Sequence, residues 1–333
     1  MSSAPTPEEI WEDARWLVQA VDPRAGLVRV VEMTPNDYRQ ASFLDDRMFA
    51  EQRVSHLLKW NEVQSAAPSN TRGDARWIFH IGHVGSTLIA RLLGELDGVL
   101  SVREPRALRD LTFFPPDVRA GFVPTVNRLM SRTFDGDQAA VIKATSFVSE
   151  IARELTGGTG KALCLFAKPQ AYISGILAGE NSRAELAGMA DVRKQRLSSR
   201  GMELSQPRNE AEAAAIAWAC EMTALEAADA SNCRWCDFDD LLDDLPRGLR
   251  VIADHLELAA SDQALSDVAA GPLTRRYSKA TEYEYSPQLR RDLLADAFAR
   301  QRGDIESALA MLNATAETAP LLRKALDRAQ AES

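Results

Sequence analysis

Five short apolar segments recur through the middle of the chain, and they limit the folds that the sequence allows. They cover residues 77–82, 99–105, 139–146, 162–169 and 233–238. Each is too short for a buried helix, and amphipathic stretches of helical length lie between them. Short apolar runs separated by helices are typical of parallel strands joined by crossovers. The sequence therefore predicts an α/β fold with three layers, in which helices cover both faces of a central, mostly parallel five-stranded sheet.

The segments before and after this pattern predict further layers around the sheet. Residues 1–73 form a lead-in, for which we expect a helix over Pro7–Ala20, a strand over 26–33 and a second helix over Asp45–Trp60. Residues 74–285 hold the five strands, and residues 286–333 have the periodicity of helices that pack on the same domain. Residues 181–230 are predicted to be mainly helical, and the long polar stretch 181–209 within them is a candidate for a mobile lid or substrate loop.

Composition argues against several classes of function. The 333 residues carry a net charge of −9, whereas proteins that follow nucleic-acid phosphates need a basic surface. The four cysteines are too few for a disulfide framework, and the C-x-x-C pair Cys233 and Cys236 has no second pair to complete a zinc site. The first residues are polar and acidic, and no apolar run approaches the ~18 residues that span a bilayer. We expect a cytoplasmic protein that binds neither nucleic acid nor membrane.

The residues after the first strand have the outline of a phosphate-binding loop. They read Gly82-His83-Val84-Gly85-Ser86-Thr87 and lead into an amphipathic helix. A strand, a glycine loop and a helix in this order point backbone N–H groups at an anion, and the two hydroxyls add donors. The ATP-type loop G-x-x-x-x-G-K-[ST] would place its lysine at Ser86 and its first glycine at His80. Because that lysine is missing, the loop disfavours ATP or GTP as the ligand.

The loop resembles the one that sulfotransferases carry after their first strand, P-[KR]-x-G-[ST]-[ST]. Gly85, Ser86 and Thr87 match this pattern, Gly82 stands at the proline and His83 stands at the basic residue. The resemblance implies a P-loop NTPase-like sandwich in which residues 82–87, Val84 included, hold the 5′-phosphosulfate of phosphoadenosine phosphosulfate (PAPS). It also implies that His83 stabilises the leaving oxygen, in a way that depends on the protonation of its ring.

Three later segments extend the resemblance over roughly residues 75–260, and weakly into the tail. "CLFAKPQAYISG" resembles the family's R-x-P and serine motif, which implies that Lys168 and Ser174 bind the 3′-phosphate, although the motif's arginine is Ala167 here. "CRWCDFDDLLDDLPRGLRVIADHLEL" resembles a late strand and helix of the family. "GPLTRRYSKATEYEY" lies where the family closes a basic loop over the 3′-phosphate, which implies this role for Arg276 and Lys279.

A carboxylate at the end of the second strand is the predicted catalytic base. Sulfuryl transfer to a hydroxyl needs a group that takes the acceptor's proton. Glu104 stands at the carboxyl end of its strand, where ligands gather in open parallel sheets, and its "REP" resembles the base of bacterial sulfotransferases. The alternative is an ion pair of Glu104 with Arg106 or Arg109 at a helix start. Packing or surface roles are expected for His56, which we place on a helix, His80 and His255.

The predicted function is transfer of a sulfuryl group from PAPS to a hydroxyl or amine of a small-molecule or peptide acceptor, without a metal. Phe113, Phe114 and Phe122 favour an apolar or peptide-like acceptor. The sequence predicts neither the acceptor's identity nor the oligomeric state.

Two alternatives remain open at this point. One is a Mg-ATP-dependent kinase of the same fold, with Asp237 or Asp239 as the magnesium ligand. We prefer to interpret Asp239 and Asp240 as acids that cap the start of a helix. The other alternative is a nucleotide-binding module that has the fold without the chemistry.

Overall fold

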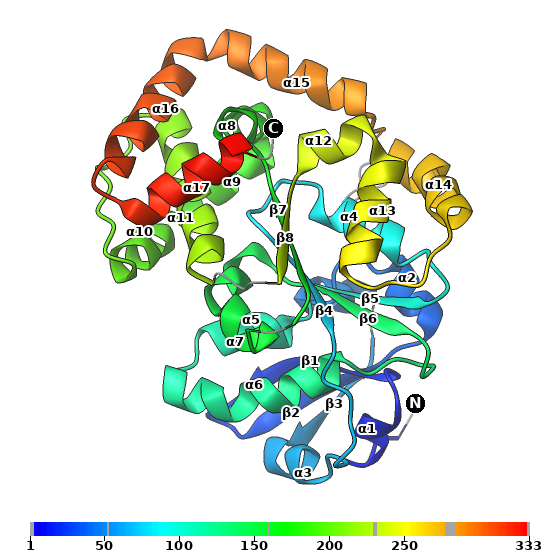
Figure 1. Ribbon diagram of the computed structural model, residues 1–333. Helices are drawn as coiled ribbons and strands as arrows, with labels where there is room; N and C mark the ends of the chain where they lie inside the picture. The colour runs from blue at the N-terminus through cyan, green and yellow to red at the C-terminus, as the bar shows by residue number, and fades with distance from the viewer. Residues whose placement is uncertain (1–2, 52, 159, 229–231, 277–283, 332–333) are drawn as a thin grey trace.

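The computed structural model of the chain describes residues 3–51, 53–158, 160–228, 232–276 and 284–331. At its centre is a five-stranded sheet in which every pairing is parallel, with the strand order β5-β6-β4-β7-β8 (Figure 1). The strands are β4 (Arg76–His80), β5 (Val99–Arg103), β6 (Ala139–Lys143), β7 (Ala162–Phe166) and β8 (Cys233–Asp237). The five predicted strands and the parallel sheet are confirmed, and each strand ends slightly before the predicted residue.

Helices cover both faces of this sheet, which completes the predicted three layers. In Figure 1, α4 (Ser86–Leu93) and α13 (Leu245–His255) lie on one side of the strands, and α5 (Arg106–Thr112), α7 (Ala152–Thr156) and α11 (Glu210–Ala228) lie on the other. The 3-10 helix η2 (Ser146–Ile151) follows β6 and packs on β4. Three further helices pack on these elements: α6 (Pro116–Met130), α12 (Phe238–Asp243) and α14 (Asp262–Ala270).

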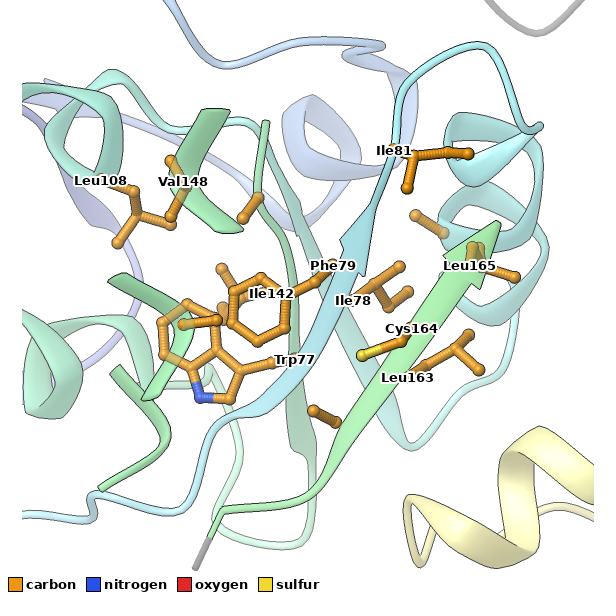
Figure 2. Packing of buried hydrophobic residues seen from close by; sticks show 14 of the residues in the cluster. Trp77, Ile78, Phe79, Ile81, Leu108, Ile142, Val148, Leu163, Cys164 and Leu165 are labelled. Carbon is orange, nitrogen blue, oxygen red and sulfur yellow. The ribbon is translucent and has the colours of Figure 1, made fainter. Parts of the chain in front are cut away.

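Alternating side chains of β4 reach into both layers. Trp77 and Phe79 stack on one face of the strand with ring centroids 5.8 Å apart, and Ile78 points to the opposite face (Figure 2). Leu108 of α5 and Val148 of η2 lie on the side of Trp77 and Phe79 (Figure 2). All five side chains are at most 1% exposed. The central strand is therefore buried on both faces, as expected of a parallel sheet covered by helices.

The N-terminal part forms a small second sheet instead of the two predicted helices. Helix α1 covers only Glu9–Glu12, and three antiparallel strands follow in the order β1-β2-β3. The strand predicted at 26–33 is confirmed as β2, whereas the helices predicted over Pro7–Ala20 and Asp45–Trp60 are wrong, and His56 lies on a strand. The elements of this part are β1 (Trp16–Asp22), β2 (Leu27–Glu32), α2 (Pro35–Gln40), η1 (Asp46–Glu51), β3 (Ser55–Lys59) and α3 (Trp60–Ser65).

The pairing of β1 and β3 with β2 explains why both helix predictions are wrong. β1 pairs with β2 along its length and is buried almost throughout, even at Gln19, so its sequence shows no polar alternation. In β3, His56 and Leu58 are half-buried, but Leu57 between them is 62% exposed. Two adjacent leucines resemble part of a helical stripe when the partner strand is not known. Local periodicity does not reveal pairings between residues that are distant in sequence.

The mainly helical character predicted for residues 181–230 is confirmed, and within it the polar stretch 181–209 forms two packed helices and little loop. After α8 (Pro169–Ala178) come α9 (Glu180–Gly188) and α10 (Ala190–Ser199), and irregular backbone covers residues 202–207. Arg196 of α10 is buried and contacts Glu221 of α11 at 2.6 Å and Glu150 of η2. Arg200 contacts the same Glu150 at 2.7 Å. These ion pairs hold α10 against the helical layer of the sheet.

The residues after 286 form helices, as the sequence predicts. They are α15 (Pro287–Arg300), α16 (Arg302–Ala316) and α17 (Pro320–Ala331), and the 3-10 helix η3 (Pro272–Arg275) precedes them. Ser286 caps α15, because its hydroxyl accepts the N–H of Leu289 at 3.0 Å. Glu226 of α11 has a fully buried side chain that contacts Lys324 and Arg328 of α17. Among the described residues, no helix is long and apolar enough to cross a membrane.

Truncation of a core side chain tests this arrangement. Ile142 is fully buried in β6, between β5 and β4, so Ile142→Ala should lower the free energy of unfolding by about 2–5 kcal/mol. The control Leu57→Ala, on the edge strand of the small sheet, should change it by ~0.5 kcal/mol or less. Urea unfolding followed by circular dichroism measures both values, and equal costs would contradict a buried β6.

Candidate functional site

The candidate site lies at the carboxyl end of β4, the central strand. The chain leaves β4 toward β5 on one side of the sheet and later reaches β7 on the other side. Ligands of open α/β sheets bind at such switch points, outside the carboxyl ends of the strands. Residues 81–85 connect β4 to α4 at this place (Figure 1). The fold thus puts the predicted phosphate loop where a ligand site is expected.

The loop turns tightly because three of its residues have a left-handed backbone. Gly82 has a φ of 80°, His83 of 55° and Gly85 of 62°. Glycine takes such angles without strain, so His83 is the strained member of the three. Gly85 meets a second constraint, because a Cβ atom there would overlap the ring of Phe238 in α12. The two glycines of the motif therefore follow from the turn and from the close approach of Phe238.

His80 fastens the start of the loop to the neighbouring strand. Its Nδ1 accepts the N–H of Gly82 at 2.9 Å, which places the proton of the neutral ring on Nε2. Nε2 lies 2.9 Å from the carbonyl oxygen of Ala144, just after β6, and donates to it. The ring is 5% exposed. His80 is therefore a packing residue, as the sequence predicts, and it also positions the loop.

The first turn of α4 faces the loop with donors that the helix itself does not use. The first N–H groups of an α-helix have no acceptor within the helix. Gly85 at the N-cap position provides no side-chain hydrogen bond to them. Ser86 and Thr87 follow in the first turn and add two hydroxyls. An anion at this end would meet N–H donors, hydroxyls and the positive end of the helix dipole.

A buried lysine stands behind this first turn. Lys143, the last residue of β6, is fully buried, and its Nζ contacts Glu104 Oε1 and lies 3.3 Å from Thr87 Oγ1. The N–H of Glu104 also donates to the Lys143 carbonyl at 2.7 Å. A buried ammonium group needs such partners, because its loss of hydration is costly. Lys143 thus joins the phosphate loop to Glu104 and places a cation beside a loop that has no lysine of its own.

Glu104 lies at the carboxyl end of β5, as predicted, in a strained conformation. Its φ is 54°, and its residue is 7% exposed. Among the described non-glycine residues, only His83, Glu104 and Glu257 have a positive φ. Strained backbone persists only where the surroundings fix it, and it is concentrated at functional sites. Two of these three residues are the ones for which the sequence predicts catalytic roles.

The ion-pair partners of Glu104 differ from the alternative that the sequence left open. Its carboxylate contacts Lys143 and Arg47, whose Nη2 lies 2.8 Å from Oε2. Arg106 and Arg109 contact Asp46 instead, at 2.9 Å and 3.5 Å. The pairing of Glu104 with Arg106 or Arg109 is therefore wrong, because both arginines turn toward the N-terminal part.

Arg47 brings the N-terminal part into the site. Its guanidinium contacts Asp45 at 2.7 Å as well as Glu104, and it lies over the ring of Phe43, 3.4 Å from the centroid. Burial acts to lower the pKa of Arg47, but the two carboxylates outweigh it, so the pKa is raised. Residues 43–47 therefore cover the outer side of Glu104 with a permanent positive charge.

A cavity of about 670 Å³ opens beside the loop. The volume falls within the usual range of ligand sites. One wall is the loop and the start of α4, the second is the junction of α8 and α9, and the third is α15. The polar side chains in these walls include His83, Ser86, Thr87, Ser182, Arg276, Glu284 and Arg290, and the apolar ones include Phe238, Leu289, Leu293 and Leu294.

The residues predicted to bind a 3′-phosphate lie in different places. Lys168 is the N-cap of α8, its side chain is 37% exposed, and its Nζ lies 3.4 Å from Asp240. Ser174 is 1% exposed, and its Oγ has no hydrogen-bond partner among the described atoms. Arg276 lines the cavity, whereas Lys168 and Ser174 are not among its lining residues. Lys279 lies outside the described residues.

Asp237, at the end of β8, acts as a helix cap. Its carboxylate accepts the N–H groups of Asp239 and Asp240 at 2.8 Å and 3.2 Å, and that of Lys168 at 3.0 Å. Burial, the largest effect, raises the pKa of Asp237. Asp239 and Asp240 lie in the first turn of α12, as expected of acids at a helix start, although the cap itself is Asp237. Asp239 also pairs with Arg290 at 2.6 Å. Within the described ranges, no cluster of three metal-binding side chains is present.

Sequence reasoning missed three residues of this site. The sequence contains a signal that points to Lys143, because this residue is a charge inside the otherwise apolar run "AAVIKATS". A lysine is almost never fully buried unless it is paired. Arg47 and Arg290 give no comparable signal, because their partners Glu104 and Asp239 are far away in the sequence.

Comparison with known proteins gives distant structural matches. No family model and no curated protein matches the sequence. A sulfotransferase domain from the curacin biosynthetic pathway is 13% identical, covering 72% of this chain and 97% of its own, with a TM-score of 0.41. The sulfotransferase domain of the Synechococcus PCC 7002 olefin synthase is 15% identical, covering 70% and 97%, with a TM-score of 0.34. At this distance the fold assignment rests on the sheet topology, and the function rests on the geometry of the site.

The two constraints on Gly85 can be separated by experiment. Gly26→Ala should cost about 1–2 kcal/mol of unfolding free energy, because Gly26 also has a left-handed backbone but open space around it. Gly85→Ala should cost clearly more, and Phe238→Leu in the same chain should recover part of the difference. Urea unfolding measures all three variants. Equal costs for the two glycine substitutions would show that Phe238 does not restrict the loop.

Proposed function

We propose that the protein is a sulfotransferase that moves a sulfuryl group from PAPS to a hydroxyl or amine of a small-molecule or peptide acceptor. The observation that carries this proposal is the junction at Thr87. There the uncapped start of α4 opens into a cavity, and a buried lysine links it to a strained glutamate. The proposal places the reaction in the cytoplasm and involves neither nucleic acid nor membrane.

The residues around the cavity fit the donor's charged groups. The N–H groups of the loop and the hydroxyls of Ser86 and Thr87 would hold the 5′-phosphosulfate. Lys143 would add positive charge from behind, where exclusion of water strengthens its effect. His83 would stabilise the leaving phosphate oxygen from the loop itself. The apolar side chains of α15 offer a surface for the nucleoside, since ligand sites are mostly apolar with a few polar groups.

The structure describes three of the four residues that the resemblance assigns to the 3′-phosphate, and of these three only Arg276 lines the cavity. Arg276 lines the cavity and is exposed. Lys168 begins α8, whose first N–H groups are directed toward the carboxyl end of the sheet. The buried hydroxyl of Ser174 has no partner in the described structure, and a buried polar group without a partner is unusual enough to need an explanation. We propose that Lys168, Ser174 and Arg276 share this role with Lys279.

Glu104 is the proposed base of the transfer. The acceptor oxygen attacks sulfur, the bond from sulfur to the phosphate oxygen breaks, and the acceptor's proton passes to the Glu104 carboxylate. Arg47 covers one oxygen of this carboxylate but is half-exposed, whereas Lys143 is fully buried. Arg47 is therefore the partner that can move aside for an acceptor. Lys143 then faces the negative charge that develops on the transferring group.

An aromatic pair follows the two elements that begin at Glu104 and Lys143. Phe113 is 68% exposed and stacks on Phe147, with the ring centroids 5.2 Å apart. Phe113 follows α5, which continues from Glu104, and Phe147 belongs to η2, which continues from Lys143. We propose that this exposed aromatic pair contributes to binding an acceptor with an apolar part.

The kinase alternative fits these residues less well. Asp237 already accepts three backbone N–H groups, and Asp239 is paired with Arg290. Neither carboxylate is placed to take a magnesium ion without breaking these contacts.

Ligand-dependent melting tests the donor without knowledge of the acceptor. Phosphoadenosine phosphate, the desulfated product, should raise the melting temperature by several degrees when present at a hundred times its Kd, since such binding adds ~2.7 kcal/mol of stability. AMP should raise the melting temperature less, because it lacks the 3′-phosphate. Adding EDTA should not change the shift that phosphoadenosine phosphate causes. A larger shift with Mg-ATP would favour the kinase, and no shift with any ligand would favour the non-catalytic module.

Substitution of the base tests the chemistry. Glu104→Gln should lower the release of phosphoadenosine phosphate from PAPS by ~10²-fold or more across a panel of hydroxyl and amine acceptors. Its melting shift with phosphoadenosine phosphate should persist. Glu226→Gln is the matched control, because Glu226 is also buried between two cations but lies away from the site. Turnover of Glu104→Gln within a few-fold of the control would remove Glu104 from the mechanism.

A further inference from the structure

The loop histidine is held by a helix that lies far from it in the sequence. Nδ1 of His83 lies 3.3 Å from the hydroxyl oxygen of Ser182, and Nε2 lies 3.5 Å from a carboxylate oxygen of Glu185. Both partners belong to α9, three residues apart, and therefore lie on one face of that helix. Both ring nitrogens of the strained loop residue are thus directed to the same short segment.

The two contacts differ in chemistry. The carboxylate of Glu185 lies at ion-pair distance from Nε2. A serine hydroxyl both donates and accepts, so the contact of Ser182 with Nδ1 is compatible with a neutral or a protonated ring. Ser182 lines the cavity beside His83. Its oxygen therefore marks the position that an oxygen of a bound anion can take at Nδ1.

We propose that Glu185 is a positioning residue for His83. It orients the ring through Nε2 and places a carboxylate beside it, while Nδ1 lies next to Ser182 at the cavity wall. The loop has histidine where related loops have a permanently charged side chain, and Glu185 compensates for this difference with an adjacent negative charge. This inference rests on the proposed function, because it assigns a role in binding the 5′-phosphate of the donor.

Other groups near His83 do not replace Glu185. The ring of Tyr172 in α8 meets His83 edge-on at 6.5 Å, and burial raises the pKa of Tyr172 far above its ordinary value, so it stays neutral. Glu180, Arg276, Glu284 and Arg290 line the same cavity. Of the described charged residues, Glu185 is the one with an ion-pair contact to His83.

The primary test is a pH titration of His83 by NMR. The chain has four histidines, so the His83 signal is identified by its loss in His83→Asn, and asparagine tolerates the left-handed backbone. The His83 signal should change over a lower pH range in Glu185→Gln than in the parent. The control is Glu210→Gln, which removes a similarly exposed carboxylate that contacts Arg183 of α9 at 3.5 Å. Equal titration of His83 in the parent and in Glu185→Gln would overturn the proposal.

A second measurement links this contact to the ligand. Affinity for phosphoadenosine phosphate should fall as the pH rises from 6 to 8, as expected when an imidazolium loses its charge. At pH 7.5, Glu185→Gln should weaken binding by up to about fivefold, the scale of one partly exposed ion pair. Glu210→Gln should bind like the parent. In a His83→Lys background the charge is permanent, so Glu185→Gln should have no effect.

The two readouts separate this inference from the proposed function. If the parent does not bind phosphoadenosine phosphate, the proposed function fails, and the NMR titration alone judges the contact between Glu185 and His83. If binding occurs but Glu185→Gln weakens it equally with histidine or lysine at position 83, Glu185 acts on the ligand directly and the positioning role is wrong. An effect confined to the histidine background supports it.

Discussion

The buried ion pair between Lys143 and Glu104 is the interaction on which the arrangement of the site depends. A fully buried ammonium is unfavourable without close partners, and here the partners are the carboxylate of Glu104, at the end of the neighbouring strand β5, and the hydroxyl of Thr87 in α4. The pair therefore fixes the ends of β5 and β6 relative to the start of α4. The N-terminal part also contributes to the site, because Arg47 forms an ion pair with the outer side of Glu104.

The loop of residues 81–85 keeps its strained shape because neighbouring residues hold it in place. His80 bonds the loop to the end of β6, and Phe238 fills the space that a side chain at Gly85 would need. The cost of a left-handed His83 is small beside the burial that surrounds it. Residues 83–87 line the cavity from this fixed loop and the start of α4. Preorganised donors stabilise a developing charge most effectively.

The parts of this structure that the sequence predicts are those that local pattern determines. The five parallel strands are apolar runs too short for helices, and the loop has its glycines at the positions that turn. Local pattern does not predict the small N-terminal sheet, because β1 is buried at every residue except Asp22 and β3 is defined by its pairing with β2. For the same reason the partners of Glu104 were misjudged. Arg106 is adjacent in sequence, but Lys143 and Arg47 are adjacent in space.

The missing lysine of the loop has a structural explanation in this arrangement. An ATP-type loop carries its cation on a flexible side chain that reaches forward over the phosphates. Here Lys143 comes from the neighbouring strand and meets the loop from behind, at the hydroxyl of Thr87. A cation in that place is fixed by the sheet and shielded from water, and it also contacts Glu104. In the proposed reaction, the same side chain therefore contacts the hydroxyl of Thr87, which would bind the donor, and the carboxylate of Glu104, which would take the acceptor's proton.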